Sequence, residues 1–205
     1  MIRFCLCLLL CLAGLLIFQS APNAAAGADD SNAPQYTADG QLMFPANYRD
    51  WIYLTTGMDM DYNPELAKTD HSMFDNIFVN PEAYKAFVAT GTWPDKTILV
   101  LEGRMAANKG SINQKGHFQT TDIMARSIHI KDEAHFPGKW AFVGFGDENV
   151  GRTFPKEAVC YSCHEQHAAV DTTFVQFYPT LLDVAKKKGT LSPAYIKEEA
   201  ASAKK

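Results

Sequence analysis

Cysteine is scarce in this 205-residue chain once its N-terminal segment is set aside. Three of the five cysteines, Cys5, Cys7 and Cys11, lie within the apolar run from Phe4 to Phe18. The rest of the chain keeps only Cys160 and Cys163, and one local pair cannot cross-link a small fold. The sequence therefore excludes a disulfide-based scaffold.

The chain also lacks an excess of positive charge, internal repeats and a long apolar segment. Its formal net charge of -4 gives no basis for a nucleic-acid partner. The apolar run is about 15 residues long, short of the roughly 20 residues that span a bilayer. Arg3 precedes this run and Ala24-Ala25-Ala26 follows it. This layout predicts a cleaved signal peptide over residues 1–26, rather than a membrane anchor, and a periplasmic or secreted protein.

The remaining chain is long enough for one domain with its own hydrophobic core. Residues 27–40 are polar, and we expect them to form a flexible N-terminal arm. We expect the folded domain over residues 41–190. Residues 191–205, rich in Lys, Glu and Ala, are expected to form a solvated C-terminal tail.

Hydrophobic periodicity and turn residues divide the domain into a strand-rich first part and a helical second part. Pro81 and Gly91 are placed to begin and end a helix. We expect strands over residues 52–56, 74–80, 97–104, 122–132 and 139–145, and helices over residues 81–90, 155–167 and 181–188. This order predicts an α+β fold, a mainly antiparallel β-sheet with a few helices.

The two remaining cysteines belong to the sequence Cys160-Tyr161-Ser162-Cys163-His164, the pattern of c-type haem attachment. Two thiols three residues apart lie on one face of a helical turn, where both can form thioethers to the vinyl groups of a porphyrin. The histidine that follows then directs its imidazole at the iron. The motif predicts one covalent haem c near the C-terminus, attached at Cys160 and Cys163 and ligated by His164.

Three other interpretations of this motif stay open. A redox dithiol is expected near the start of a βαβ unit, whereas this motif follows a strand-rich region. A zinc site could use Cys160, Cys163, His164 and His167, although four ligands within eight residues of one short helix make poor tetrahedral geometry. A structural disulfide is the third.

The sixth coordination position of the iron has no obvious ligand, because no methionine follows His164. The upstream candidates are Met43, Met58, Met60, Met73, Met105, Met124 and His129. Methionine ordinarily serves as a packing residue. We therefore expect a five-coordinate iron whose open face binds small molecules. A four-helix-bundle cytochrome would share these properties, but the strands between residues 97 and 145 argue against a bundle.

Several segments together resemble the cytochrome P-460 family and its relatives, the β-sheet cytochromes c-prime. The matching residues are 44–51, 77–84, 90–97, 130–132, 138–142, 160–164 and 171–181. The resemblance implies a mainly antiparallel sheet that carries one haem. It also implies a small nitrogen compound, such as nitric oxide or hydroxylamine, as the ligand.

The chain departs from the hydroxylamine-oxidising members of that family at three positions. Leu101 stands where those enzymes join a lysine to the porphyrin, and Lys96 is expected on the opposite strand face. Ser127 stands in place of a proton-accepting glutamate, with His129 on the same face as a proton relay. Asp75 stands in place of an arginine near the haem. The resemblance thus implies haem contacts at Leu101 and Asp75, a distal side at Ser127 and His129, and no cross-link.

We therefore expect an exported monohaem cytochrome that binds a small nitrogen oxide or passes electrons to a redox partner protein. One alternative is an enzyme that oxidises hydroxylamine or a related compound, with Ser127 and His129 as its catalytic residues. The other alternative is an electron carrier with a six-coordinate iron. The sequence leaves a homodimer open.

Overall fold

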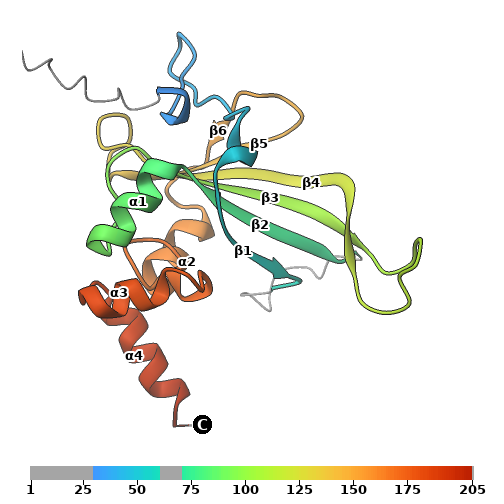
Figure 1. The fold of residues 1–205 in the computed structure, drawn as a ribbon. Helices are drawn as coiled ribbons and strands as arrows, with labels where there is room; N and C mark the ends of the chain where they lie inside the picture. The colour runs from blue at the N-terminus through green and yellow to red at the C-terminus, as the bar shows by residue number, and fades with distance from the viewer. Residues whose placement is uncertain (1–29, 61–70, 205) are drawn as a thin grey trace, which may run out of the picture.

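The computed structural model describes residues 30–60 and 71–204. In this part of the chain, six strands form one antiparallel sheet in the order β1-β2-β3-β4-β5-β6, accompanied by four α-helices (Figure 1). The strands are β1 (Ile52–Met58), β2 (Met73–Val79), β3 (Thr97–Ala107), β4 (Phe118–Lys131), β5 (Trp140–Phe145) and β6 (Arg152–Thr153). The helices are α1 (Pro81–Thr90), α2 (Val159–His167), α3 (Leu182–Lys188) and α4 (Pro193–Ser202). The predicted α+β fold is confirmed.

Side-chain alternation along the central strands gives the sheet two different faces. In β4, Ile128 and Ile130 point to one face and are buried, whereas Ser127 and His129 point to the other. This is the alternation that the sequence predicts for residues 122–132. The β3–β4 hairpin is the longest in the sheet and extends beyond the other strands (Figure 1).

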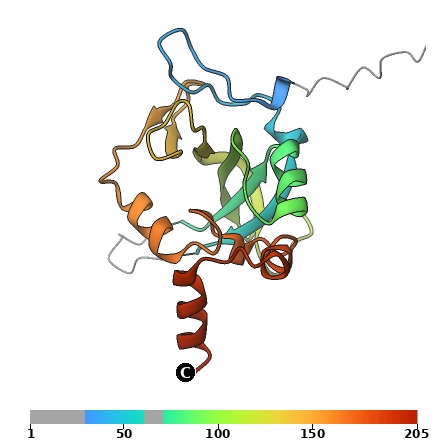
Figure 2. The ribbon, with the colours of Figure 1, turned by 90° about the vertical axis from the view of Figure 1, so that its left-hand side faces the viewer.

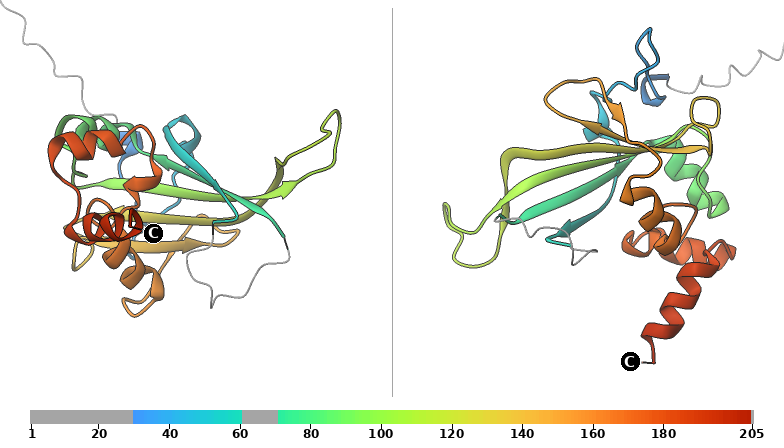
Figure 3. Two further views of the ribbon diagram at one scale, coloured as in Figure 1. Left: turned by 90° about the horizontal axis from the view of Figure 1, so that it is seen from below. Right: turned by 180° about the vertical axis from the view of Figure 1, so that it is seen from behind.

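The helices cover one face of the sheet at one end, as the view from below shows (Figure 3). A hydrophobic core lies between them and the sheet. Phe87 of α1 and Trp93 after it pack with ring centroids 4.3 Å apart. The core also contains Leu54, Val79, Leu99, Trp140, Val170, Val175, Tyr178, Leu181 and Ala185. This core fixes the C-terminal half of the chain against the strands.

The segment before β1 covers the opposite face, called here the back face. Leu42, Phe44, Tyr48 and Trp51 are buried there against Ile98, Val100, Ile128, Ile130, Val143 and Phe145. The Trp51 indole N–H donates to Asn32 Oδ1 at 2.8 Å. The described part of the expected arm, residues 30–40, therefore contacts the domain. The expected signal peptide, residues 1–26, lies outside the described residues.

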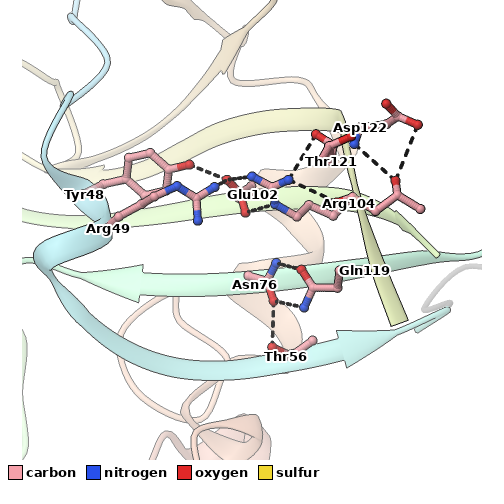
Figure 4. A network of polar contacts seen from close by, with 10 residues as sticks. Tyr48, Arg49, Thr56, Asn76, Glu102, Arg104, Gln119, Thr121 and Asp122 are labelled. Atoms are coloured by element: carbon pink, nitrogen blue, oxygen red, sulfur yellow. Dashed lines mark hydrogen bonds and ion pairs between the residues drawn. The ribbon is translucent and has the colours of Figure 1, made fainter. Parts of the chain in front are cut away.

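Charged and polar side chains lie at the outer end of the back face (Figure 4). Glu102 of β3 is 1% exposed and accepts hydrogen bonds from Tyr48, Arg49 and Arg104, the last at 2.6 Å from Nε. Beside it, Asn76 and Gln119 exchange hydrogen bonds of 2.7 and 3.0 Å. We call Tyr48, Arg49, Glu102 and Arg104 the Glu102 cluster.

The structure differs most clearly from the prediction in three places. β4 begins at Phe118, because its first residues pair with the end of β3 across the extended hairpin. α2 begins at Val159 rather than at residue 155, because residues 155–158 form a turn closed by Ala158 N–H and the carbonyl of Pro155. The expected tail contains α4, which projects away from the rest of the described chain (Figure 2). No helix in the described residues is both long and apolar enough to cross a membrane.

Candidate functional site

A cavity of about 280 Å³ lies between the sheet and α2. The sheet contributes residues from β1 to β5, Met60 follows β1, and the C-terminal half of the chain contributes the rest. Its lining includes Thr55, Gly57, Met60, Asp75, Ile77, Leu99, Leu101, Ser127, His129, Phe142, Phe154, Cys160, His164, Phe174, Phe177 and Tyr178. Most of these residues are apolar, so the cavity suits a large hydrophobic group with few polar contacts.

The helix α2 carries the Cys-x-x-Cys-His motif along one edge of the cavity. Tyr161, between the two cysteines, fixes this helix against the sheet. Its hydroxyl accepts from Phe142 N–H at 3.2 Å and donates to the carbonyl of Phe154 at 3.3 Å. Lys156 lies 4.2 Å from the Tyr161 ring centroid and donates to the carbonyl of Trp140 at 2.8 Å. The motif and the segment just before it are therefore both anchored to β5.

The His164 imidazole is held in one orientation. Its Nδ1 lies 2.7 Å from the carbonyl oxygen of Thr172, which makes Nδ1 the protonated nitrogen. The rings of Phe174 and Phe142 lie 4.1 and 4.7 Å from it, centroid to centroid. Burial lowers the pKa of His164, and the hydrogen bond to Thr172 opposes this only in part. A neutral imidazole with Nδ1 engaged presents Nε2 as a metal ligand.

The thiols of Cys160 and Cys163 are half-buried and are not joined to each other. Burial raises the pKa of Cys163, and the neighbouring Cys160 and Glu198 raise it further. A reactive redox dithiol needs the opposite shift. Within the described residues, no three His, Cys, Asp or Glu side chains are arranged to hold a metal ion. His167 instead pairs with Glu198 at 3.1 Å. These observations disfavour the redox and zinc interpretations of the motif.

The strands bring all four predicted strand residues into the cavity lining. Leu101 pairs with Ile77 on one side and with Ser127 on the other, so these side chains form one row across β2, β3 and β4. Asp75 lies one row further along β2 and lines the same cavity. Burial raises the pKa of Asp75, and the charge of Asp59 adds to this effect.

Lys96 lies at the start of β3, outside the cavity lining. Its ammonium forms an ion pair with Asp132, which is 1% exposed. Leu101 is thus the β3 side chain beside Ser127, and the Lys96 amine is engaged elsewhere. This placement agrees with the expectation that Lys96 points away from the site.

His129 lies beside His164 rather than across the cavity from it. The two rings meet edge to face with centroids 5.2 Å apart, and His129 Nε2 lies 3.1 Å from the hydroxyl of Thr172. Its ring stacks on Phe142 at 4.0 Å. Burial lowers the pKa of His129 well below its ordinary value, with further contributions from His164 and Lys156. This position is at odds with the distal role expected for His129, because its Nε2 already bonds to Thr172 on the His164 side.

One of the upstream methionines lines the cavity. Met60 lies over Gly57 of β1, so closely that a β-carbon added to this glycine would meet its sulfur at 2.5 Å. Met43, Met58, Met73, Met105 and Met124 are not among the residues that line it. Met60 is therefore the remaining methionine candidate for a sixth ligand.

A comparison with protein families identifies the chain. A family model described as cytochrome P460 matches residues 45–175, more than half of the sequence. The chain belongs to the cytochrome P460 family. No curated protein matches it. Membership indicates a c-type haem cytochrome and binding of haem c, in a family whose members are typically exported.

The donor set of this cytochrome P460 family member fits such a cofactor. Two thiols and an imidazole lie on one short helix, with Cys160 and His164 lining an apolar cavity. The spacing matches thioether attachment, and His164 has its tautomer fixed for ligation through Nε2. Cys160, Cys163 and His164 would hold the haem, which would supply an iron that can change its oxidation state.

Several residues of the site were not singled out from the sequence. Thr172, Phe142, Phe174 and Tyr161 are brought there by tertiary packing. Tyr161 could have been found, because it lies inside the attachment motif. Thr172 had no local signal, since its function depends on a carbonyl that every residue has.

Proposed function

We propose that this protein is an exported monohaem c-type cytochrome that binds a small nitrogen oxide, such as nitric oxide, at an open iron position. Cys160 and Cys163 form the thioethers and His164 is the single protein ligand. The export rests on the signal-peptide pattern in residues 1–26. Electron transfer with a redox partner protein would restore the oxidation state of the iron between binding events.

The observation that carries this proposal is the character of the cavity wall on the sheet. Ile77, Leu99 and Leu101 make it mainly apolar. Its polar members are Thr55, Asp75, Ser127 and His129. An apolar wall excludes water and favours a small neutral ligand over a hydrated ion. The fixed His164 imidazole would donate electron density to the iron.

Hydroxylamine oxidation is less well supported by these residues. Leucine at position 101 has no amine with which to bond to a porphyrin, and the nearby Lys96 is paired with Asp132. A serine at position 127 is a poor base at neutral pH. Binding without turnover is therefore the function that this cavity favours.

The second candidate is an electron carrier with a filled sixth position. The observation that favours it is Met60, whose thioether lines the cavity. A low-spin ferric spectrum that Met60→Leu converts to high spin would support this candidate. A high-spin ferric spectrum in the unaltered protein would oppose it.

Replacement of both motif cysteines tests the haem attachment. We expect Cys160→Ala with Cys163→Ala to abolish covalent haem, because no thiol remains in the described domain to form a thioether. The measurement is haem staining after denaturing electrophoresis, together with the intact mass of the mature protein. Cys160→Ala alone should leave one thioether and serves as the control. Haem that survives denaturation in the double variant would contradict the attachment.

A further inference from the structure

We propose that His129 is a positioning residue for the haem ligand His164, and that it acts through Thr172. This proposal rests on the proposed ligation of haem by His164. It assigns His129 to the ligand side of the iron and gives it no part in proton delivery to a bound molecule.

The contacts form one continuous chain of three residues. The Nδ1–H of His164 donates to the carbonyl of Thr172, at 2.7 Å. The hydroxyl of the same threonine is hydrogen-bonded to His129 Nε2, at 3.1 Å. A single residue therefore contacts the haem ligand through its backbone and contacts His129 through its side chain.

The segment that carries Thr172 needs such a contact because it is a tight turn. Val170 and Thr173 pair with each other across it, and Asp171 adopts a left-handed conformation with φ of 52°. Thr173 faces the hydrophobic core, where its hydroxyl accepts from the Trp93 indole at 2.7 Å. The core thus fixes one side of the turn. The hydroxyl of Thr172 is the contact that fixes the side facing His164.

His129 is suited to this role because it is itself immobilised. It is 9% exposed, lies within β4 between two paired strands, and stacks on Phe142 with ring planes 11° apart. Trp140 contacts it from the same strand as Phe142, with centroids 4.5 Å apart. The sheet therefore determines the position of Nε2, and Nε2 determines the position of Thr172.

The consequence for the cofactor follows from the strength of the His164 hydrogen bond. A hydrogen bond from Nδ1–H to a carbonyl makes the imidazole a stronger electron donor, which favours ferric iron. If the Thr172 carbonyl is allowed to move, this bond weakens. The reduction potential should then rise, and the iron–histidine bond of the ferrous protein should weaken.

The experiment compares Thr172→Val, His129→Phe and the double variant in the covalent holoprotein. Valine keeps the shape of threonine without the hydroxyl, and phenylalanine keeps the stack on Phe142 without Nε2. We expect each single variant to shift the midpoint potential upward and the ferrous iron–histidine stretching frequency downward. The double variant should show the same shift as either single variant, because both remove one shared interaction.

Two matched variants separate positioning from a general loss of stability. Thr97 is a buried threonine whose hydroxyl donates to the carbonyl of Pro94 at 2.7 Å, away from the cavity. We expect Thr97→Val to lower the melting temperature and leave potential and stretching frequency unchanged. Thr172→Ser retains the hydroxyl and should restore both readouts toward those of the unaltered protein.

Unchanged potential and stretching frequency in both His129→Phe and Thr172→Val would overturn the proposal, as would additive shifts in the double variant. Failure of the proposed function would look different. In that case the unaltered protein would carry no covalent haem, or His164→Ala would leave the spectrum of the haem as it was. If either His129→Phe or Thr172→Val binds no haem, the potential and stretching frequency of the other variant test the proposal, because both variants remove the same hydrogen bond.

Discussion

At the scale of single residues, Asp75 is the unusual feature of the cavity. It is a carboxyl group on a wall that is otherwise largely apolar, and burial raises its pKa. A group with a raised pKa is protonated below that value and ionised above it. In its protonated form Asp75 can donate a hydrogen bond to a molecule bound in the cavity, and in its ionised form it cannot.

Replacement of Asp75 with asparagine tests this role. In the unaltered protein, dissociation of nitric oxide should accelerate as the pH rises through the Asp75 pKa, because the donor is lost. Asp75→Asn should show no such acceleration, because an amide donates at every pH. The measurement is the dissociation rate across a pH series. Asp50→Asn, at an exposed carboxyl outside the cavity, is the control. A pH profile that Asp75→Asn leaves unaltered would exclude Asp75 as the donor.

What could be predicted for single residues depended on how local the signal was. The attachment motif lies within five residues, so Cys160, Cys163 and His164 could be placed by spacing alone. Strand alternation correctly put Ser127 and His129 on the cavity face. It could not tell which of the two lies beside His164. Two residues along a strand span about 6.6 Å, enough to place Ser127 beside Leu101 and His129 beside His164.

At the scale of elements, the segment before β1 is a structural part of the domain. Its aromatic and aliphatic side chains close the back face of the sheet. The folded domain was expected from residue 41 onward, but this packing on the back face could not be predicted. The segment has no helix or strand periodicity and reaches the sheet by isolated contacts. In α4, by contrast, a local signal was available. Ser192 accepts from Tyr195 N–H and Pro193 occupies the first turn, which is a typical helix start.

Truncation of one side chain measures how much this segment contributes to the stability of the domain. Leu42 is 3% exposed, so we expect Leu42→Ala to lower the free energy of unfolding by about 2–5 kcal/mol. The adjacent Met43 is 41% exposed, and Met43→Ala should change the free energy of unfolding by less than about 1 kcal/mol. Denaturant unfolding of the two variants makes the comparison. Equal effects at both positions would show that the segment does not seal the back face.

At the scale of the whole molecule, the two faces of the sheet have different roles. The helix-covered face contains the cavity, and the back face is sealed by apolar packing and by the Glu102 cluster. Burial raises the pKa of Glu102, but the hydrogen bonds from Arg104 and Tyr48 and the charges of Arg49 and Arg104 outweigh burial and lower it. Ionised Glu102 therefore stabilises the fold, although the exposure of Arg49 weakens its part.

The stability of the molecule should fall at low pH because Glu102 in this cluster becomes protonated. The contribution of Glu102 is fully present above about pH 4.3, the ordinary glutamate value, and is lost as the pH falls through its lower folded value. Glu102→Gln should lower the free energy of unfolding by about 1.5–3 kcal/mol at neutral pH. It should also reduce the loss of stability on acidification. Glu148→Gln, at an exposed site, should leave the profile unaltered. If Glu102→Gln loses as much stability at low pH as the unaltered protein, other groups cause the acid sensitivity.

The most direct test of the open haem site is the absorption spectrum of the purified holoprotein, ferric and ferrous, with and without nitric oxide. We expect an ordinary c-type reduced spectrum, a high-spin ferric form, and a clear change in both states when nitric oxide is added. A red-shifted Soret band would show that the porphyrin carries a further covalent link despite leucine at position 101. A low-spin ferric spectrum that nitric oxide does not alter would show that the sixth position is filled, and would contradict the account.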